Sequence, residues 1–565
     1  MGPTDRSNFT LNMDPYRYFS TAASTGLNSP DSLETSGAVP VFAALTLLLT
    51  FVGLFGTVLF SGSPIRDDVG ILLDCGRLIL HGWIPYVDYV EMNPPLAHYI
   101  NVIPVYLAGQ LHVEIPTAFY IFVLAFAVYS AAALTYLLSK FTPVFSLSSR
   151  LVLAAMCLLF SLWVFRTGEF GQKDHLFALA YIPWLYCREI RHGGGTIPRW
   201  VGIVVGLVGG PLFLLKPHFC LVVAFVEAWL LFVSRRFSSL WQPEILALAC
   251  WVLGYAVHFC LVSSEMRDSL FYRWLPFIIA NYDVYNHTLS EIARQFSTKF
   301  RLLQILVILA ALALMTKPRL PNNWKFQLHG LVASTLAAWG IFIMQHKGWS
   351  YHLLPAISIE MLLAGTLAVI LLEWEGAVSV FHRASHAIRT VMFLVLCFSL
   401  SLLSLGMDHS IFPSAKGYDP VNDFVRLIEQ RVAPDERVAF ISTSVAPAYP
   451  TLIYAKRLPG TRFLQAFPIA YLYKGAKPRA DGTPPYHSSS EVTPEERRFL
   501  DELGSDTLKN RPKLVFIESG HDCQACPKGF RIDKYLVAEG WLQMYLKNYT
   551  FMRTLHGFAV YVRTD

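Results

Sequence analysis

The sequence predicts a polytopic α-helical membrane protein with about eleven transmembrane helices and a small extracytoplasmic α/β domain at the C-terminal end. Three observations predict this class. The 565 residues are 54% hydrophobic and only 15% charged, and their mean hydropathy is +0.42, far from the balance of a soluble domain. Apolar runs of nearly membrane-crossing length recur up to about residue 406. Beyond that point the composition changes to short strand and helix patterns.

The N-terminal segment, residues 1–38, is polar and carries both acidic and basic side chains. It lacks the short basic start of a cleaved signal peptide, so we expect the first apolar run to be retained as a span. Residues 1–38 are then expected to be a cytoplasmic tail.

The transmembrane part is expected to comprise residues 39–406. A helix of about twenty apolar residues crosses a membrane, and several of the runs, notably the fourth to the sixth, are shorter, so tilt is expected. The expected spans lie near residues 39–60, 117–138, 150–165, 175–187, 200–215, 219–233, 244–262, 302–316, 328–344, 354–373 and 389–406.

Basic residues in the short loops predict the orientation. If the spans alternate, these residues all fall on one side, which the positive-inside rule assigns to the cytoplasm. The basic residues are Lys140, Arg150, Arg188, Arg191, Arg199, Arg235, Arg236, Lys317, Arg319, Lys325, Arg383 and Arg389. The outer side then holds a first outer loop at residues 61–116 and the C-terminal domain. The net charge of +6 is spread over loops, which argues against nucleic-acid binding.

The C-terminal domain, residues 407–565, is long enough for a core of its own. "RVAFISTS" and "PKLVFIES" are typical of short buried strands. "TPEERRFLDELGSDTLKN" predicts a helix that is capped by Thr493 and has Pro494 in its first turn. Between them, "YKGAKPRADGTPPYHSSS" predicts a loop.

The chain has nine cysteines, of which Cys523 and Cys526 form the one close pair. "CQAC" fits a disulfide, half of a zinc site or a redox motif, and there is no second CxxC. If the domain is extracytoplasmic, a structural disulfide is favoured.

The first outer loop opens with two adjacent carboxylates, Asp67 and Asp68. An amphipathic segment follows through Leu80, and then "HGWIPYVDYVEMNPPL" adds aromatic residues suited to a membrane interface. This pattern predicts a helix that lies along the membrane, with Trp83, Tyr86 and Tyr89 at headgroup level. The two carboxylates alone are also compatible with simple capping of that helix.

Four motifs together resemble a known family. They are the acidic pair followed by "GRLILHGWIPYVDYVEMNPPL", then "GQKDHLFALAYIPWL", "LLKPHF" and "QHKGWSYHLLP". In this order they look like GT-C glycosyltransferases, specifically the bacterial members of the group of dolichyl-phosphate-mannose protein mannosyltransferases and aminoarabinose transferases. The resemblance covers most of residues 40–375.

The resemblance implies a GT-C-like transmembrane catalytic domain in a bacterial inner membrane, with its active site facing the periplasm. It implies transfer of a sugar, with inversion, from a polyprenyl-phosphate donor to the hydroxyl of a glycan, lipid or protein acceptor. It also implies a catalytic aspartate early in the first outer loop. Spacing to the following "GR" favours Asp68, while Val69, where relatives have an acid, keeps Asp67 as the alternative. Many relatives have a lysine where this chain has Asn93.

Chemistry agrees with this assignment. A carboxylate can take the proton of an acceptor hydroxyl, and a phosphate ester can leave if cations stabilise its charge. The candidate cations on the outer side are Arg66, Lys173, Lys216, His218, His346, Lys347 and His352. For each lysine, placement of the charge at the membrane interface is the alternative explanation.

Four further polar residues complete the candidate site. Asp174 and His175 are expected to face the acceptor, or to bind a divalent cation together with Asp68, although the sequence has no diagnostic metal-ligand spacing. Glu91 and Asp88 are expected to be structural or acceptor-facing. No cofactor other than that divalent cation is implied.

Two other functions fit the sequence. A transporter or flippase for a lipid-linked saccharide would also have many spans with charges, but its polar groups should lie near the middle of the bilayer. An oligosaccharide ligase or polymerase would use the same chemistry with a pyrophosphate-linked donor. Because the polar clusters crowd one side, the sequence favours the glycosyltransferase over the transporter.

Overall fold

The computed structural model describes residues 38–140, 145–295, 298–318, 320–373, 391–396, 399, 421–477, 479, 484, 486–487 and 491–564. Within these residues, seven helices are long and apolar enough to cross a membrane, so the chain is an integral membrane protein. They are α2 (Ala38–Phe60), α5 (Ile115–Leu138), α6 (Leu147–Arg166), α9 (Pro217–Ser234), α10 (Pro243–Leu261), α15 (Asn322–Gln345) and α16 (Leu354–Glu373).

Three further helices occupy the remaining expected spans up to residue 373. They are α7 (Lys173–His192), α8 (Arg199–Phe213) and α14 (Thr298–Met315). The first ten expected spans therefore each coincide with a helix. The eleventh, at residues 389–406, lies mostly outside the described residues, as do the tail at residues 1–37 and Arg319, Arg383, Arg389 and Cys397. The total of eleven spans remains a prediction.

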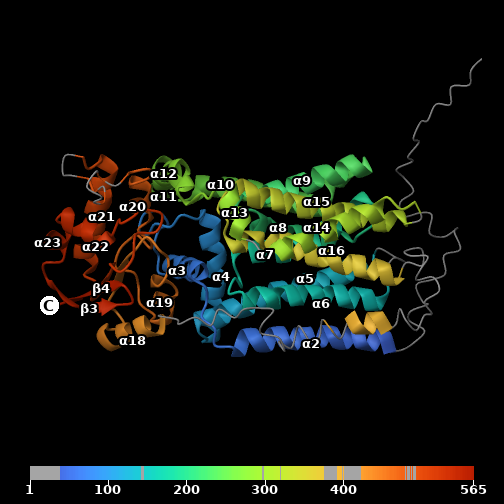
Figure 1. Ribbon diagram of the computed structural model, residues 1–565, viewed down its shortest axis with the longest axis horizontal. Helices are drawn as coiled ribbons and strands as arrows, with labels where there is room; N and C mark the ends of the chain where they lie inside the picture. The colour runs from blue at the N-terminus through green and yellow to red at the C-terminus, as the bar shows by residue number, and fades with distance from the viewer. Residues whose placement is uncertain are drawn as a thin grey trace, which may run out of the picture.

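The long helices run side by side, and the C-terminal domain stacks on one end of the bundle (Figure 1). We call this end the domain end and the opposite one the far end. Helix α7 is central, because every residue except Arg191 is buried. A helix that is buried all round and still carries charged side chains must pair or use each of them.

The first outer loop contains two helices, α3 (Asp67–Leu80) and α4 (Pro95–Leu111), which pack on each other. Helix α4 was not expected. It starts at the second proline of "NPPL", where the N–H that proline lacks would have no partner within the helix. The helix lies across the direction of the spans at the domain end (Figure 1).

The expected position of the first-loop aromatic residues is wrong for two of them. Tyr86 is 2% exposed and Tyr89 is fully buried, so neither can lie among lipid headgroups. Helix α3 is also covered by protein, because α4 packs on one side and α19 (Ala448–Tyr454) of the C-terminal domain packs on another.

Polar contacts join α3 to the C-terminal domain. The hydroxyl of Tyr449 donates to Asp74 at 2.9 Å, and Arg77 donates to the carbonyl of Arg457 at 2.6 Å and to Asp74 at 2.7 Å. The side chains of Asp74 and Arg77 are both buried, so these hydrogen bonds compensate for the loss of their contacts with water.

The C-terminal domain contains a four-stranded sheet in the order β1-β2-β4-β3. The parallel pair is β1 (Val438–Ile441) and β2 (Leu514–Glu518), which confirms both expected strands. The strands β4 (Phe558–Arg563) and β3 (Tyr549–Leu555) follow in antiparallel pairing.

The described part of this domain also contains six helices: α18 (Val421–Arg431), α19, α20 (Phe467–Leu472), α21 (Pro494–Asn510), α22 (Ile532–Ala538) and α23 (Trp541–Tyr545). The expected helix at Thr493 is α21, whose first turn donates to the Thr493 hydroxyl from the backbone N–H of Glu496. Of the three alternatives for "CQAC", the structure contains the disulfide, between Cys523 and Cys526.

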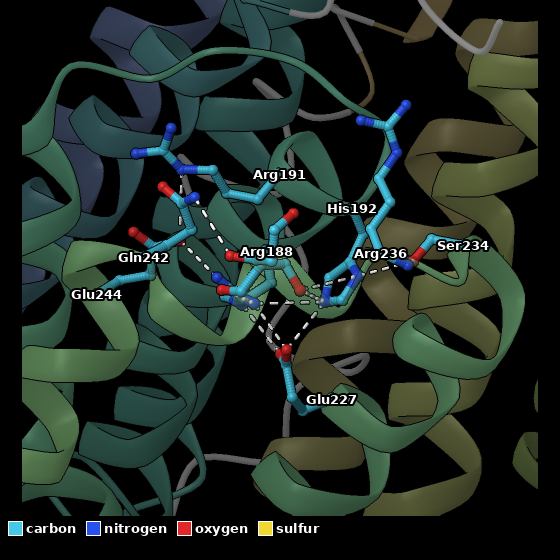
Figure 2. A network of polar contacts seen from close by, with 10 residues as sticks. Arg188, Arg191, His192, Glu227, Ser234, Arg236, Gln242 and Glu244 are labelled. Carbon is cyan, nitrogen blue, oxygen red and sulfur yellow. Dashed lines mark hydrogen bonds and ion pairs between the residues drawn. The ribbon is translucent and has the colours of Figure 1, made fainter. Parts of the chain in front are cut away.

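A buried charge network joins α7, α9 and α10 toward the far end of the bundle, and Figure 2 shows its side chains. Arg188 of α7 donates to both oxygens of Glu227 on α9, at 2.9 and 2.6 Å, and to Glu244 on α10 at 2.6 Å. His192 contacts Glu227 at 2.9 Å and the Ser234 hydroxyl at 2.9 Å. Three helices are therefore joined here by one arginine.

Candidate active site

The two aspartates at the head of α3 have different partners. The Asp67 carboxylate lies 3.0 Å from the Arg66 guanidinium. Asp68 has a single, long hydrogen bond among the described residues, at 3.5 Å from the Gln172 side chain just before α7. Asp68 therefore retains free acceptor positions, whereas Asp67 is committed to an ion pair.

Burial, and after it the charge of Asp68, raises the pKa of Asp67, and Arg66 opposes this only in part. Asp67 therefore accepts a proton more readily than a free aspartate does. Two neighbouring carboxyl groups in unlike surroundings can take unlike roles. The sequence could predict the pair but not this division.

Glu169, in the turn between α6 and α7, is a site residue that the sequence analysis did not single out. One of its oxygens accepts from the Ser350 hydroxyl at 3.0 Å and lies 3.9 Å from Arg66, and the other is buried without a partner among the described residues. Burial raises its pKa, which Arg66 partly offsets. The available signal was a carboxylate flanked by glycine on the predicted outer side.

A cluster of buried cations and imidazoles lies beside these carboxylates. Lys216, just before α9, donates to Asp174 at 2.6 Å. Lys173 is 6% exposed and makes no hydrogen bond or ion pair to any side chain that the structure describes. The charges of both lysines act on the rings of His218 and His352, which lie 6.3 Å apart between ring centroids.

Each histidine of this cluster has an unused nitrogen. The Nε2 of His218 and the Nδ1 of His352 are buried and have no hydrogen-bond partner within the described part of the chain. Buried polar atoms are nearly always bonded in folded proteins, so such atoms point to a ligand. We call Lys173, Lys216, His218 and His352 the cation cluster.

Lys216 has an altered affinity for its proton. Burial lowers its pKa to about 8, although the charges of Asp174 and, more weakly, Asp68 act in the opposite direction. The ammonium also lies 5.0 Å from the centre of the Tyr351 ring. Asp68 is thus close enough to the cation cluster to interact with it electrostatically.

Three helices begin at this site. Asp68 is in the first turn of α3, Lys173 is the first residue of α7, and Lys216 immediately precedes α9. Helix N-termini carry a partial positive charge and free N–H groups, which favours an anion between them.

The two remaining cation candidates, His346 and Lys347 of "QHKGW", bond to other parts of the chain. Lys347 donates to the carbonyl of Tyr282 at 2.6 Å and to the Asn286 side chain at 2.7 Å, so it fastens the loop that contains these residues. Burial lowers its pKa to about 8. The backbone of His346 ends α15 in a left-handed conformation and accepts from the N–H of His287 at 2.7 Å.

His175, Glu91 and Asp88 have local partners. His175 accepts from the N–H of Gly171 at 3.1 Å and contacts Ser161 at 3.3 Å. Glu91 accepts from the backbone and side chain of Asn93, both at 2.7 Å, and contacts His98 at 3.1 Å. Asp88 accepts from the N–H of Ile84 at 2.8 Å. The structure does not bring these three side chains into contact with Asp68.

The described residues contain no group of three or more His, Cys, Asp or Glu side chains placed to hold a metal ion. Asp174 in particular is engaged by Lys216. A cation shared by Asp68 and Asp174 would first have to displace this ammonium.

No protein-family model matches the chain, and no curated protein matches it. Three solved structures are similar to the chain, each at low sequence identity and with a TM-score below 0.5. ArnT from Cupriavidus metallidurans bound to undecaprenyl phosphate is 12% identical with a TM-score of 0.49, and apo ArnT is 14% identical with a TM-score of 0.44; each alignment covers 93% of this chain and 98% of ArnT. The mycobacterial arabinofuranosyltransferase AftD is 13% identical with a TM-score of 0.44, over 94% of this chain and 40% of AftD. These likenesses assign no role to any residue of this chain.

Proposed function

We propose that this chain is an inverting glycosyltransferase that moves a sugar from a polyprenyl-phosphate donor to an acceptor hydroxyl at the outer face of the membrane. One observation carries the proposal. A carboxylate with free acceptor positions, Asp68, lies beside a buried cation cluster in which Lys173 and two histidine nitrogens lack partners among the described residues.

The arrangement suits a single displacement. Asp68 takes the proton of the acceptor hydroxyl while that oxygen attacks the anomeric carbon. The carbon–oxygen bond to the phosphate breaks, and the leaving phosphate keeps the electron pair. Lys173, Lys216 and the N-termini of α7 and α9 stabilise its charge, so no acid is needed to protonate it. Attack opposite to the leaving group inverts the anomeric carbon.

Both alternative functions can be separated from this one. A flippase would move the lipid-linked sugar without forming a glycosidic bond, so its activity would not need Asp68 as a base. A pyrophosphate-linked donor would carry one more charged group than the cation cluster is proposed to bind. The orientation is part of the proposal: a bacterial inner membrane with the domain end facing the periplasm.

The test replaces the base by its isostere. In membranes that contain native acceptor, Asp68→Asn is expected to lower transfer from labelled polyprenyl-phosphate sugars by about 10²- to 10⁴-fold, while the purified protein still binds undecaprenyl phosphate. The matched control is Glu114→Gln in the same loop, which removes a carboxylate from an exposed ion pair with Lys456 and is expected to leave transfer unchanged.

Full activity of Asp68→Asn would exclude this base. An inactive Asp67→Asn combined with an active Asp68→Asn would move the assignment by one residue. The same membranes treated with EDTA test the divalent cation: loss of transfer that added Mg²⁺ or Mn²⁺ restores would require a metal in the mechanism.

A further inference from the structure

A cavity lies where the first outer loop meets the C-terminal domain. Its volume is about 190 Å³, below the range of about 300–1,000 Å³ typical of pockets for drug-sized ligands, so it fits one small unit. It is separate from Asp68 and the cation cluster, none of which line it. The lining residues used below are Trp83, Asp88, Arg437, Arg462, Asp506 and Lys509.

Arg437 is the principal charge of this cavity. Its guanidinium lies 4.9 Å from the centre of the Trp83 ring, and one N–H donates to the Asn510 side chain at 2.9 Å. Within the described residues it forms no ion pair with any carboxylate. A guanidinium that is stacked on an aromatic face and keeps free N–H groups at its edge is suited to bind a planar anion through two hydrogen bonds.

Arg462, unlike Arg437, is paired with a carboxylate. Its side chain donates twice to Asp506, at 2.9 Å each, and its backbone N–H donates to the same carboxylate at 2.8 Å. This pair is satisfied within the protein. Lys509, at the exposed end of α21, has no hydrogen bond or ion pair in the part of the chain that the structure describes. Among the described residues the cavity therefore has two positive charges without an ion pair, Arg437 and Lys509, and one such negative charge, Asp88.

Asp88 adds a hydrogen-bond acceptor to the cavity. One of its oxygens accepts from the Ile84 N–H at 2.8 Å, and the side chain is exposed, which leaves acceptor positions toward the cavity. A simple inorganic anion would be repelled by this carboxylate. A ligand with an anionic group and neighbouring hydroxyls can satisfy the arginine and the carboxylate together.

We infer that this cavity binds one acidic sugar unit, in which a carboxylate or phosphate group is held by Arg437 and Lys509 and a ring hydroxyl donates to Asp88. The recognition is independent of the transfer chemistry. Only the role of the bound sugar, as part of the acceptor, rests on the proposed function.

The position of the cavity fits an acceptor role. Trp83 and Asp88 belong to the segment that continues to Asn93 and α4, and the backbone N–H of Val90 in this segment donates to the carbonyl of Arg462 at 2.7 Å. Further along the segment, Glu91 interacts electrostatically with Lys173 of the cation cluster. A single short segment therefore connects the cavity with the candidate active site.

The experiment measures binding to the full-length protein in detergent by calorimetry, without any donor. Glucuronate and glucose 6-phosphate are the acidic sugars, and they carry a carboxylate and a phosphate group respectively. Glucose lacks the anionic group, and inorganic phosphate lacks the sugar hydroxyls. At least one acidic sugar is expected to bind, and Arg437→Gln is expected to weaken it by at least about tenfold. Lys509→Gln is also expected to weaken binding of the acidic sugar, and Lys534→Gln, an exposed lysine on α22 outside the cavity, is its matched control.

Three results would overturn the inference: no binding of either acidic sugar, equal binding of glucose or inorganic phosphate, or unchanged affinity in Arg437→Gln. Arg437→Lys, which keeps the charge and loses the forked geometry, is expected to give an intermediate affinity and serves if the glutamine variant does not fold. Asp68→Asn should bind the acidic sugar as the unaltered protein does. Failure of the cavity and failure of the proposed transfer are thus observed separately.

Discussion

The lysines at the domain end differ sharply in how many hydrogen bonds and ion pairs they form. Lys347 is fully bonded to a loop, Lys216 shares its charge with Asp174, and Lys173 has neither a hydrogen bond nor an ion pair among the described residues. Since an unpaired charge on a largely buried side chain is costly, Lys173 is the residue whose environment is expected to improve most when a phosphate binds.

Lys216 gives the site a dependence on pH. Its pKa of about 8 means that the side chain is charged below that pH and neutral above it. The affinity for undecaprenyl phosphate is therefore expected to fall as the pH rises from about 7 to about 9, as measured by titration of the purified protein. Lys216→Arg, which stays charged throughout, is expected to remove this fall. An equally steep fall in Lys216→Arg would assign the titration to another group.

The sequence could identify residue types at this site better than their partners. Asp67, Asp68 and the lysines are visible from their charge beside apolar runs. Glu169 is not, because its partners Arg66 and Ser350 are 103 and 181 positions away and come together only through packing. The same holds for the pairing of Lys216 with Asp174, which removes Asp174 from the free carboxylates.

Among the elements, the contact between α3 and α4 determines where Asp68 lies. Gly76 of α3 is so close to α4 that an added Cβ would be 2.6 Å from the backbone of Asn101. Gly76→Ala is expected to force the helices apart, to lower stability by about 1–3 kcal/mol and to reduce transfer, as measured by thermal unfolding and the membrane assay. Gly109→Ala on α4, where a Cβ meets nothing within 4 Å, is the matched control and should retain both stability and activity.

The far-end network holds α7, α9 and α10 together through Arg188. Arg188→Ala would leave Glu227 and Glu244 buried without their main partner, and the expected loss of stability is about 3–5 kcal/mol. Thermal unfolding in detergent measures it. Arg199→Ala, which removes an exposed arginine at the start of α8, should have little effect. Similar losses for both variants would mean that the network contributes nothing specific.

Elements were predictable from the sequence where hydropathy alone determines them. The ten helices at the expected spans within residues 39–373 and the strands β1 and β2 follow from long and short apolar runs. Helix α4 was missed because its start at "NPPL" reads as a turn and its 17 residues are short for a span. The buried position of Tyr86 and Tyr89 depends on the C-terminal domain, whose packing on the first loop no local pattern reveals.

For the whole molecule, the bundle and the C-terminal domain are joined by buried contacts. In α3, Asp74 accepts a hydrogen bond from the C-terminal domain and Arg77 donates one to it. Removing the domain would therefore expose both charges and the adjoining apolar face. A chain truncated after residue 406 is therefore expected to lack transfer activity even when it is inserted in the membrane. Activity of the truncated chain equal to that of the full chain would show that the domain is dispensable.

Helix α7 is fixed at both ends, by the ion pair of Asp174 with Lys216 in its first turn and by the Arg188 network near its last turn. A helix held in this way cannot slide or tilt freely, whereas the candidate span at α2 is only 28% buried and can adjust to its surroundings. The depth at which a carrier phosphate would meet the protein is then set by the length of α7. Bilayers of different thickness would change the tilt of the peripheral helices and leave that depth constant.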